Sequence, residues 1–177
     1  MTDTRRLNKA LWTNMTRLKL LTKPDAHVKF ILEKSPFDDD DNDDDNQAFI
    51  EKDEYLIIGR IYPNSNIYKE GSYRIELKLT SKYPIEPPEV RFLTRIYHPN
   101  VDQNGIFCYH LLSNSSRWKL NRETTLVELI RSIVKHLDEP DPDYAVTLEI
   151  GKEYMNNRVE FNRKALETMK KYSLPRN

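Results

Sequence analysis

The sequence has a single cysteine, Cys108, among its 177 residues, so no disulfide can form within the chain. Its first residues, MTDTRRLNKA, lack the apolar run of a signal peptide. Both features favour a reducing intracellular compartment, and we expect the protein in the cytoplasm, the nucleus or both. No segment approaches ~18 consecutive apolar residues, which predicts that no part of the chain spans a membrane.

The sequence also lacks an excess of charge of either sign, since 28 Lys and Arg balance 28 Asp and Glu. The charges are unevenly spread, however, because residues 38–45 read DDDDNDDD and hold seven of the acids. The rest of the chain is therefore basic by about seven charges. The basic residues form no sustained stripe interleaved with aromatic residues, which argues against nucleic acid as a partner.

The first 23 residues combine positive charge with a helical pattern. They carry six Lys or Arg and one acid, Asp3, which suits an acidic protein surface as a partner; an ordinary solvated helix face is the alternative. Apolar residues recur there at spacings of three and four, and this periodicity predicts an amphipathic helix over residues 4–20. The apolar positions are Leu7, Leu11, Met15 and Leu18.

Four later segments are rich in β-branched and aromatic residues and partly alternate: residues 28–34, 54–62, 73–80 and 90–93. Turn residues such as PNSN and KEGS separate them, so we expect four antiparallel strands in a meander. The connection over residues 35–53 is too long for a hairpin turn and contains the Asp run. Because such a run repels itself and cannot pack, we interpret residues 38–46 as a disordered loop insertion within a single domain, residues 1–177.

Residues 94–124 show little periodicity, and a structureless stretch of that length inside a compact domain is usually functional. Helical patterns follow it. The first places Leu126, Ile130, Ile133, Val134 and Leu137 on one face.

Capping pairs mark the starts of two of these helices. Thr125 with Glu128 begins the first, which the prolines of EPDPDY end, and a shorter helical segment lies near residues 146–155. Asn157 with Glu160 begins the last, whose apolar face comprises Phe161, Ala165, Met169 and Tyr172. The order of helix, four strands, long loop and helices predicts an α+β domain with helices segregated from an antiparallel sheet.

The stretch HPNVDQNGIFCYH holds Cys108 between His98 and His110. Metal ligation by these three residues matches no common zinc spacing. Burial as a small apolar residue is opposed by the turn signal Asn104-Gly105, which places Cys108 just past a tight turn in a surface loop. A thiol hydrolase would use His98 or His110 as its base, but no acid or amide that would orient such a histidine is identifiable.

The segment YPIEPPEVRFLTRIYHPNVDQNGIFC resembles the active-site region of ubiquitin-conjugating (carrier) enzymes. The shared features are a Tyr-Pro-x-x-Pro-Pro turn, the His-Pro-Asn triplet at residues 98–100, and a cysteine eight residues after the asparagine. Trp118 and the EPDP break match the family as well. The resemblance extends over about residues 4–173 without the Asp run, and it implies the UBC-like fold, with the same order of helix, meander, active-site loop and helices.

The resemblance implies that Cys108 takes the C-terminal carboxyl group of ubiquitin or a ubiquitin-like modifier from an activating enzyme as a thioester. It then yields the modifier to a substrate lysine or a ligase cysteine. Asn100 matches the family asparagine that stabilises the oxyanion of the tetrahedral intermediate or braces the loop, while His98 and Pro99 shape the site. The activating enzyme uses the ATP, so this chain is expected to need no cofactor and no metal.

The sequence departs from the family pattern near the cysteine. Tyr144 stands where many members have an acid or a serine that orients the incoming lysine, and His110 occupies another position that is commonly Asp or Ser. A lengthening between Cys108 and Trp118 resembles the SUMO-carrying branch, whereas TRIYHPNV resembles ubiquitin carriers. The two cues conflict on the modifier.

The resemblance also assigns partner surfaces. Arg5, Arg6 and Lys9 on the first helix would face an acidic groove of the activating enzyme, a surface that the ligase shares. Ile85, Trp118 and the residues after Trp118 match loops that contact ring-type ligases. The rival hypothesis is a noncatalytic variant of the domain that serves as a binding module; Tyr144 favours it and Cys108 opposes it.

Overall fold

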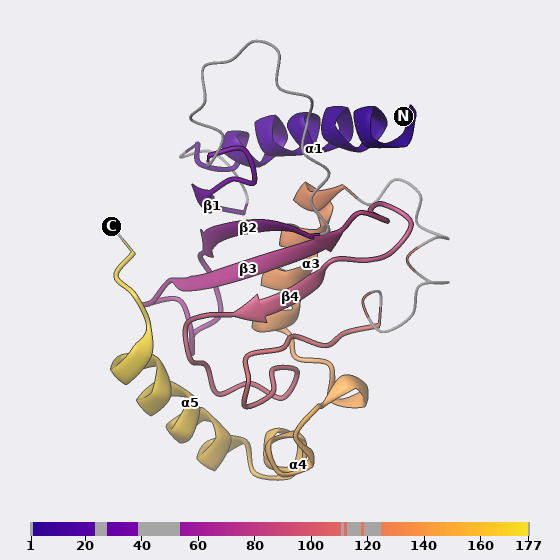
Figure 1. Ribbon diagram of the computed structural model, residues 1–177. Helices are drawn as coiled ribbons and strands as arrows, with labels where there is room; N and C mark the ends of the chain where they lie inside the picture. The colour runs from indigo at the N-terminus through magenta and orange to yellow at the C-terminus, as the bar shows by residue number, and fades with distance from the viewer. Residues whose placement is uncertain are drawn as a thin grey trace.

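A computed structural model describes residues 2–23, 28–38, 54–110, 112, 118 and 125–176 of the chain, without the side chains of residues 2–8. The helices are α1 (Thr2–Leu20), α3 (Leu126–Asp138), α4 (Leu148–Asn156) and α5 (Arg158–Tyr172), with a short 3₁₀ helix, η1 (Pro142–Tyr144). The strands are β1 (Phe30–Lys34), β2 (Glu54–Ile61), β3 (Tyr73–Thr80) and β4 (Glu89–Phe92). This is the predicted α+β order, and Figure 1 shows the helices lying outside a single sheet.

The four strands form one antiparallel sheet in the order β1-β2-β3-β4, which confirms the predicted meander. Alternation along β3 sets its two faces, since every second residue from Tyr73 to Leu79 is buried and those between are more exposed. Ile57 of β2 pairs with Leu77 of β3, so both side chains enter the same core.

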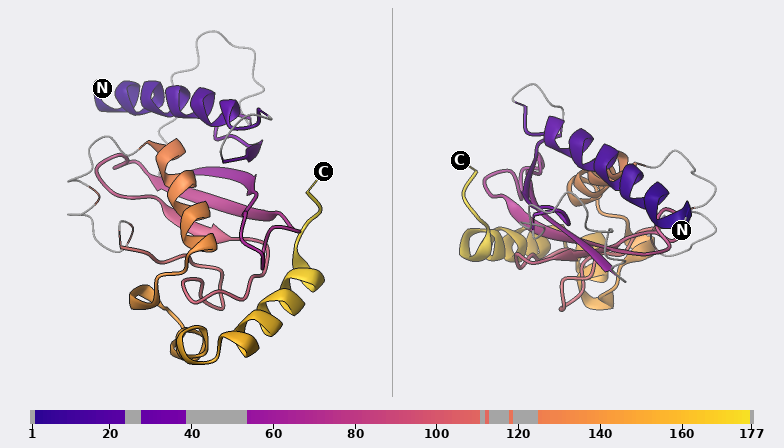
Figure 2. Two further views of the ribbon diagram at one scale, coloured as in Figure 1. Left: turned by 180° about the vertical axis from the view of Figure 1, so that it is seen from behind. Right: turned by 45° about the horizontal axis from the view of Figure 1, so that its top comes forward.

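Helix α3 covers one face of the sheet, as the view from behind in Figure 2 shows. Its apolar stripe is buried as predicted: Leu126, Leu129, Ile130, Ile133, Val134 and Leu137. Helix α1 lies against α3 and β1, where Leu11, Met15 and Leu18 are buried. The side chain of Asn14 accepts a hydrogen bond from the Leu126 backbone N–H (3.1 Å), which joins α1 to the start of α3.

The two predicted capping residues occupy their positions. Thr125 Oγ1 accepts from the Glu128 N–H (3.2 Å) at the start of α3, and Asn157 Oδ1 accepts from the Glu160 N–H (3.3 Å) at the start of α5. The EPDPDY segment ends α3 and forms η1, as its prolines predict.

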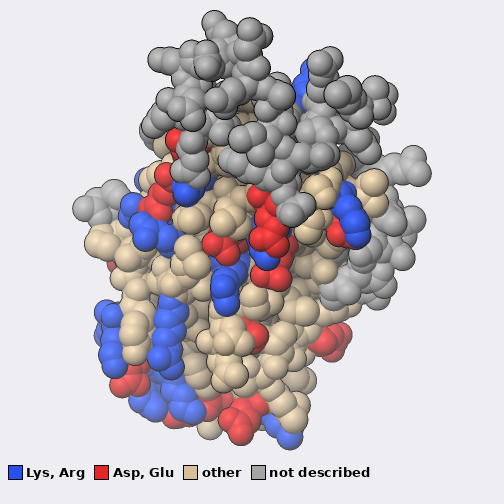
Figure 3. Space-filling view, in the orientation of Figure 1, with Lys and Arg blue, Asp and Glu red and all other residues tan. Residues whose placement is uncertain are grey.

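The other face of the sheet is not covered by α3, and Figure 3 shows basic and acidic residues mixed over it. Glu33 of β1 accepts hydrogen bonds from Arg60 of β2 (2.7 Å) and Arg74 of β3 (2.6 Å), so one carboxylate joins three strands. Partial burial raises the pKa of Glu33, but the hydrogen bonds from Arg74 and Arg60 outweigh it, and the pKa lies below its usual value.

We expect Glu33→Gln to lower the free energy of unfolding at neutral pH by about 1 kcal/mol, because two charge-assisted bonds are lost from a partly exposed site. A lowered carboxyl pKa contributes stability above its unfolded-state value of 4.5, and this contribution is lost as the pH falls through the folded-state value. Urea denaturation of both proteins at pH 7 and at acidic pH measures this, and the difference between them should shrink in acid.

The matched control is Glu128→Gln, which removes the exposed pair between Glu128 and Arg131 on α3. That pair should contribute close to nothing in water. Equal losses of unfolding free energy in the two variants would contradict the role assigned to the contacts of Glu33 with Arg60 and Arg74. A Glu33→Gln effect that persists unchanged in acid would contradict it as well.

The predicted insertion at residues 38–46 lies outside the described residues except for Asp38, so it stays a prediction. The Asp38 carboxylate accepts a hydrogen bond from the Ser35 N–H (2.6 Å) at the end of β1. Beyond this segment the chain returns to the same sheet, since β2 pairs with β1. In the part of the chain that the structure describes, no helix has the length and apolar character to cross a membrane.

Candidate active site

A tight turn precedes Cys108, as the Asn104-Gly105 signal predicted. The Asp102 carboxylate accepts from the backbone N–H groups of Asn104 and Ile106 (both 2.8 Å), and Gly105 adopts a positive φ of 84°. The strand-like residues after the turn are tied to β4, because the Phe107 N–H donates to the Val90 carbonyl (2.9 Å). Cys108 therefore emerges from a turn fixed to the sheet.

We expect Gly105→Ala to lower the free energy of unfolding by about 2 kcal/mol. The positive φ disfavours a side chain, and an added Cβ would clash with the Phe92 carbonyl oxygen. Urea denaturation measures the loss. Gln103→Ala, an exposed change in the same turn, is the control and should be nearly neutral; a similar loss in both variants would show that the backbone argument is wrong.

Cys108 is half-buried, and its backbone N–H donates to the Asn100 carbonyl (2.9 Å). Burial raises the pKa of its thiol, so the thiolate is a small fraction at neutral pH. Among the described residues, no acidic or basic side chain forms a hydrogen bond with this thiol. Within the described part of the chain, this thiol therefore lacks the bonded base of a hydrolytic dyad.

His98 is fully buried and acts through its two ring nitrogens. Its Nδ1 accepts from the Asn100 backbone N–H (3.1 Å), so its Nε2 carries the proton and donates to the His136 carbonyl at the end of α3 (3.1 Å). Burial lowers the pKa of His98 to about 3, which keeps the ring neutral. These contacts fit the predicted site-shaping role and leave no lone pair for base catalysis.

The other two residues of the triplet hold the segment that follows α3. Asn100 is fully buried, its Nδ2 donates to the Asp141 carbonyl (2.7 Å), and its Oδ1 accepts from the Asp141 N–H (3.0 Å). The Pro99 carbonyl accepts from the Val146 N–H (2.9 Å). Of the two roles that the resemblance offered for Asn100, these contacts favour bracing of the loop.

His110 and Tyr144, the two residues that depart from the family pattern, lie close together. The rings of His110 and Tyr144 have centroids 6.1 Å apart, and His110 also lies 6.1 Å from the His136 ring. The Tyr109 ring packs on His136 at 4.5 Å. Tyr144 of η1 thus borders His110, two residues after Cys108.

The proline turn is held by Trp118, whose indole N–H donates to the Pro84 carbonyl (2.8 Å) beside the cis Tyr83–Pro84 peptide bond. The Trp118 side chain is only 3% exposed, so it supports the turn from the protein interior and has little surface to offer a partner. Ile85, in contrast, is 58% exposed. Of the predicted ligase contacts, Ile85 is therefore the exposed one, and residues 119–124 after Trp118 lie outside the described part of the structure.

The predicted activating-enzyme surface lies on α1. Lys9 is exposed there, and the side chains of Arg5 and Arg6 lie outside the described part of the structure. The exposed Trp12 ring stacks on Phe37 with centroids 4.6 Å apart, so α1 presents aromatic as well as basic surface.

Sequence reasoning missed His136 and Asp141 as site residues. Among the described residues, the group that could hold a metal ion comprises His110 with His136 and Asp141, and it includes neither His98 nor Cys108. The EPDP motif contains Asp141 and could have pointed to it, because this motif marks the loop after α3 that Pro99 and Asn100 hold by hydrogen bonds.

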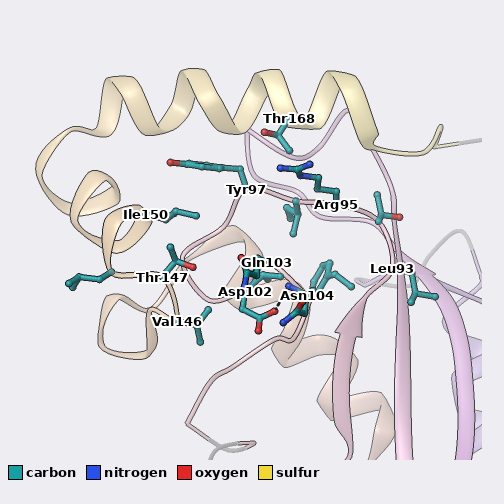
Figure 4. A pocket seen from close by; sticks show the side chains of 16 residues that line it. Leu93, Arg95, Tyr97, Asp102, Gln103, Asn104, Val146, Thr147, Ile150 and Thr168 are labelled. Atoms are coloured by element: carbon teal, nitrogen blue, oxygen red, sulfur yellow. Dashed lines mark hydrogen bonds between the residues drawn. The ribbon is translucent and has the colours of Figure 1, made fainter.

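A surface pocket of about 940 Å³ lies apart from the cysteine, between the segment after β4 and the start of α4. Figure 4 shows Arg95, Tyr97 and Thr168 on one side of it and Asp102, Gln103 and Asn104 on the other. Cys108 does not line this pocket.

Comparison with known proteins agrees with this geometry. Residues 33–169 match the family described as ubiquitin-conjugating enzyme. One similar protein is the ubiquitin-conjugating enzyme E2-18 kDa of Drosophila melanogaster, which is 31% identical over 121 residues, covering 67% of this chain and 77% of that protein. With this match, the antiparallel meander and the flanking helices are the UBC fold, and the chain belongs to the ubiquitin-conjugating enzyme family.

Proposed function

We propose that this protein accepts ubiquitin or a ubiquitin-like modifier on Cys108 as a thioester and passes it to a substrate lysine or a ligase cysteine. The observation that carries the proposal is the 2.9 Å hydrogen bond from the Cys108 N–H to the carbonyl of Asn100. It ties the lone cysteine to the triplet that also holds the loop after α3. A half-buried thiol is thereby fixed at the junction of two loops.

The proposed reaction is two successive acyl transfers. The Cys108 sulfur attacks the carbonyl carbon of the modifier's thioester on the activating enzyme; a new C–S bond forms and the activating enzyme's thiol leaves. A lysine amine then attacks the same carbonyl carbon, an amide forms, and the Cys108 thiol leaves. The amine loses a proton as the thiol regains one. ATP is spent on the activating enzyme, so the step on this chain needs no cofactor or metal.

Three features support the proposed partners. Lys9 and Trp12 give α1 an exposed basic and aromatic surface for the activating enzyme or the ligase, and Ile85 offers an apolar contact on the proline turn. Tyr144 and His110 border the path of an incoming lysine, so discharge should depend on a ligase more than in a carrier with an acid at position 144.

A charging assay tests this proposal. The purified chain is incubated with ATP, ubiquitin and a ubiquitin-activating enzyme, and in parallel with SUMO and its own activating enzyme, then run on non-reducing gels. We expect an adduct with one modifier that disappears when a thiol reductant is added. The modifier that forms it resolves the conflict between TRIYHPNV and the lengthened segment after Cys108.

Two other outcomes would support the rivals. Binding of ubiquitin or a ligase without an adduct would favour the noncatalytic binding module. Turnover of small esters without any activating enzyme would favour a thiol hydrolase, a reaction that the neutral, fully bonded His98 does not support as base.

A further inference from the structure

Three potential ligands converge beside the active-site loop: His110 from that loop, His136 from the last turn of α3, and Asp141 from the segment before η1. One ligand atom from each lies within 4.8 Å of the other two, and all three residues are half-buried. They come from three separate elements, so the cluster is a product of the fold and not of a local sequence motif.

His136 is held in a form suited to ligation. Its Nδ1 lies 2.7 Å from the Ser132 carbonyl, which can only accept, so Nδ1 carries the proton in the neutral ring and Nε2 keeps its lone pair. A hydrogen bond from one ring nitrogen to a backbone carbonyl is usual for histidines that bind metal through the other nitrogen. Packing against the Tyr109 ring fixes the imidazole plane further.

Asp141 is held just as firmly. Its backbone N–H and carbonyl are both bonded to the Asn100 side chain, and its carboxylate accepts from the Asp143 N–H (3.0 Å). One carboxylate oxygen therefore already has a partner, while a carboxylate has further lone pairs to give. Two of the three potential ligands thus hold their positions through hydrogen bonds to the surrounding backbone and side chains.

We propose that His110, His136 and Asp141 form a binding site for a divalent transition metal ion, with Zn²⁺ the best match. Two imidazoles exclude Mg²⁺ and Ca²⁺, which select oxygen ligands. Two histidines and one carboxylate are a ligand set that Zn²⁺ uses where one coordination position stays open to water or another ligand. This site was not expected from the sequence, and it is separate from the acyl transfer, which needs no metal.

The test is a titration of the full chain with Zn²⁺ by calorimetry, and with Co²⁺ by visible absorption, whose bands report the coordination. We expect a single ion per chain. His136→Phe keeps a ring against Tyr109 but removes both nitrogens, and Asp141→Asn keeps the backbone bonds to Asn100. Each should weaken Zn²⁺ binding by at least about tenfold.

Two control variants locate the site. Asp143→Asn removes an exposed acid two residues from Asp141, and Cys108→Ser removes the nearby thiol. Both should bind Zn²⁺ as the unmodified chain does, and circular dichroism melting should show all four variants folded. No saturable binding, or binding lost in Cys108→Ser but kept in Asp141→Asn, would overturn the proposal. Because this readout needs no activating enzyme, its failure is distinguishable from failure of the charging assay.

Discussion

Cys108→Ala is expected to abolish the thiol-sensitive adduct in the charging assay, a loss on the order of 10⁴-fold or more. Cys108 is the only cysteine in the chain, so no other thiol can replace it. The half-buried side chain loses only its sulfur atom, and the backbone bond to the Asn100 carbonyl is kept. The melting temperature should therefore change little, and the loss of the adduct can be assigned to chemistry.

Cys108→Ser is the matched variant, because a hydroxyl keeps the size of the side chain and can form an ester. We expect a slowly formed adduct that withstands a thiol reductant, since an oxygen ester exchanges with thiols far less readily than a thioester does. An adduct that persists unchanged in Cys108→Ala would place the acceptor elsewhere in the chain and contradict the assignment.

Asn100→Ala is expected to slow discharge of the charged protein onto lysine by about 10² to 10³, while charging itself survives. That range is the usual effect of removing one oxyanion donor. Loss of the brace should slow discharge as well, because the amide is fully buried and bonds both the carbonyl and the N–H of Asp141. Alanine leaves two backbone groups of that loop without partners, which should also lower the free energy of unfolding by about 1 to 3 kcal/mol. Single-turnover discharge to free lysine and urea denaturation measure the two effects.

The same variant separates the two roles of Asn100. If the amide braces the loop, the Asp141 N–H loses its acceptor, and its hydrogen exchange should accelerate by about ten- to a hundredfold, in step with the slower discharge. Discharge that falls while exchange at Asp141 stays as it was would mean that the hydrogen bond from the Asp141 N–H to Asn100 Oδ1 does not hold in solution, and it would assign the amide to the oxyanion. The two hydrogen bonds between the Asn100 side chain and the Asp141 backbone favour the first result. Unchanged discharge would exclude both roles.

The pattern of the sequence determined the elements of this fold. Strands β2 and β3 begin where the β-branched segments begin, and the stripe from Leu126 to Leu137 is buried as its spacing predicts. Thr125 and Asn157 cap the helices that they precede. These features follow from interactions within a few residues, so periodicity, turn residues and caps were enough to find them. The order of the motifs around Cys108 was enough to indicate the family.

Only the tertiary structure decided how the loop residues are used. Asn100 and Asp141 are 41 residues apart, and His98 bonds a carbonyl 38 residues away, so no local pattern joins them. The burial of Trp118 under the proline turn and the meeting of His110 with His136 and Asp141 likewise depend on where α3 ends relative to the sheet. Side-chain packing across the whole domain sets that position, and a single sequence does not display it.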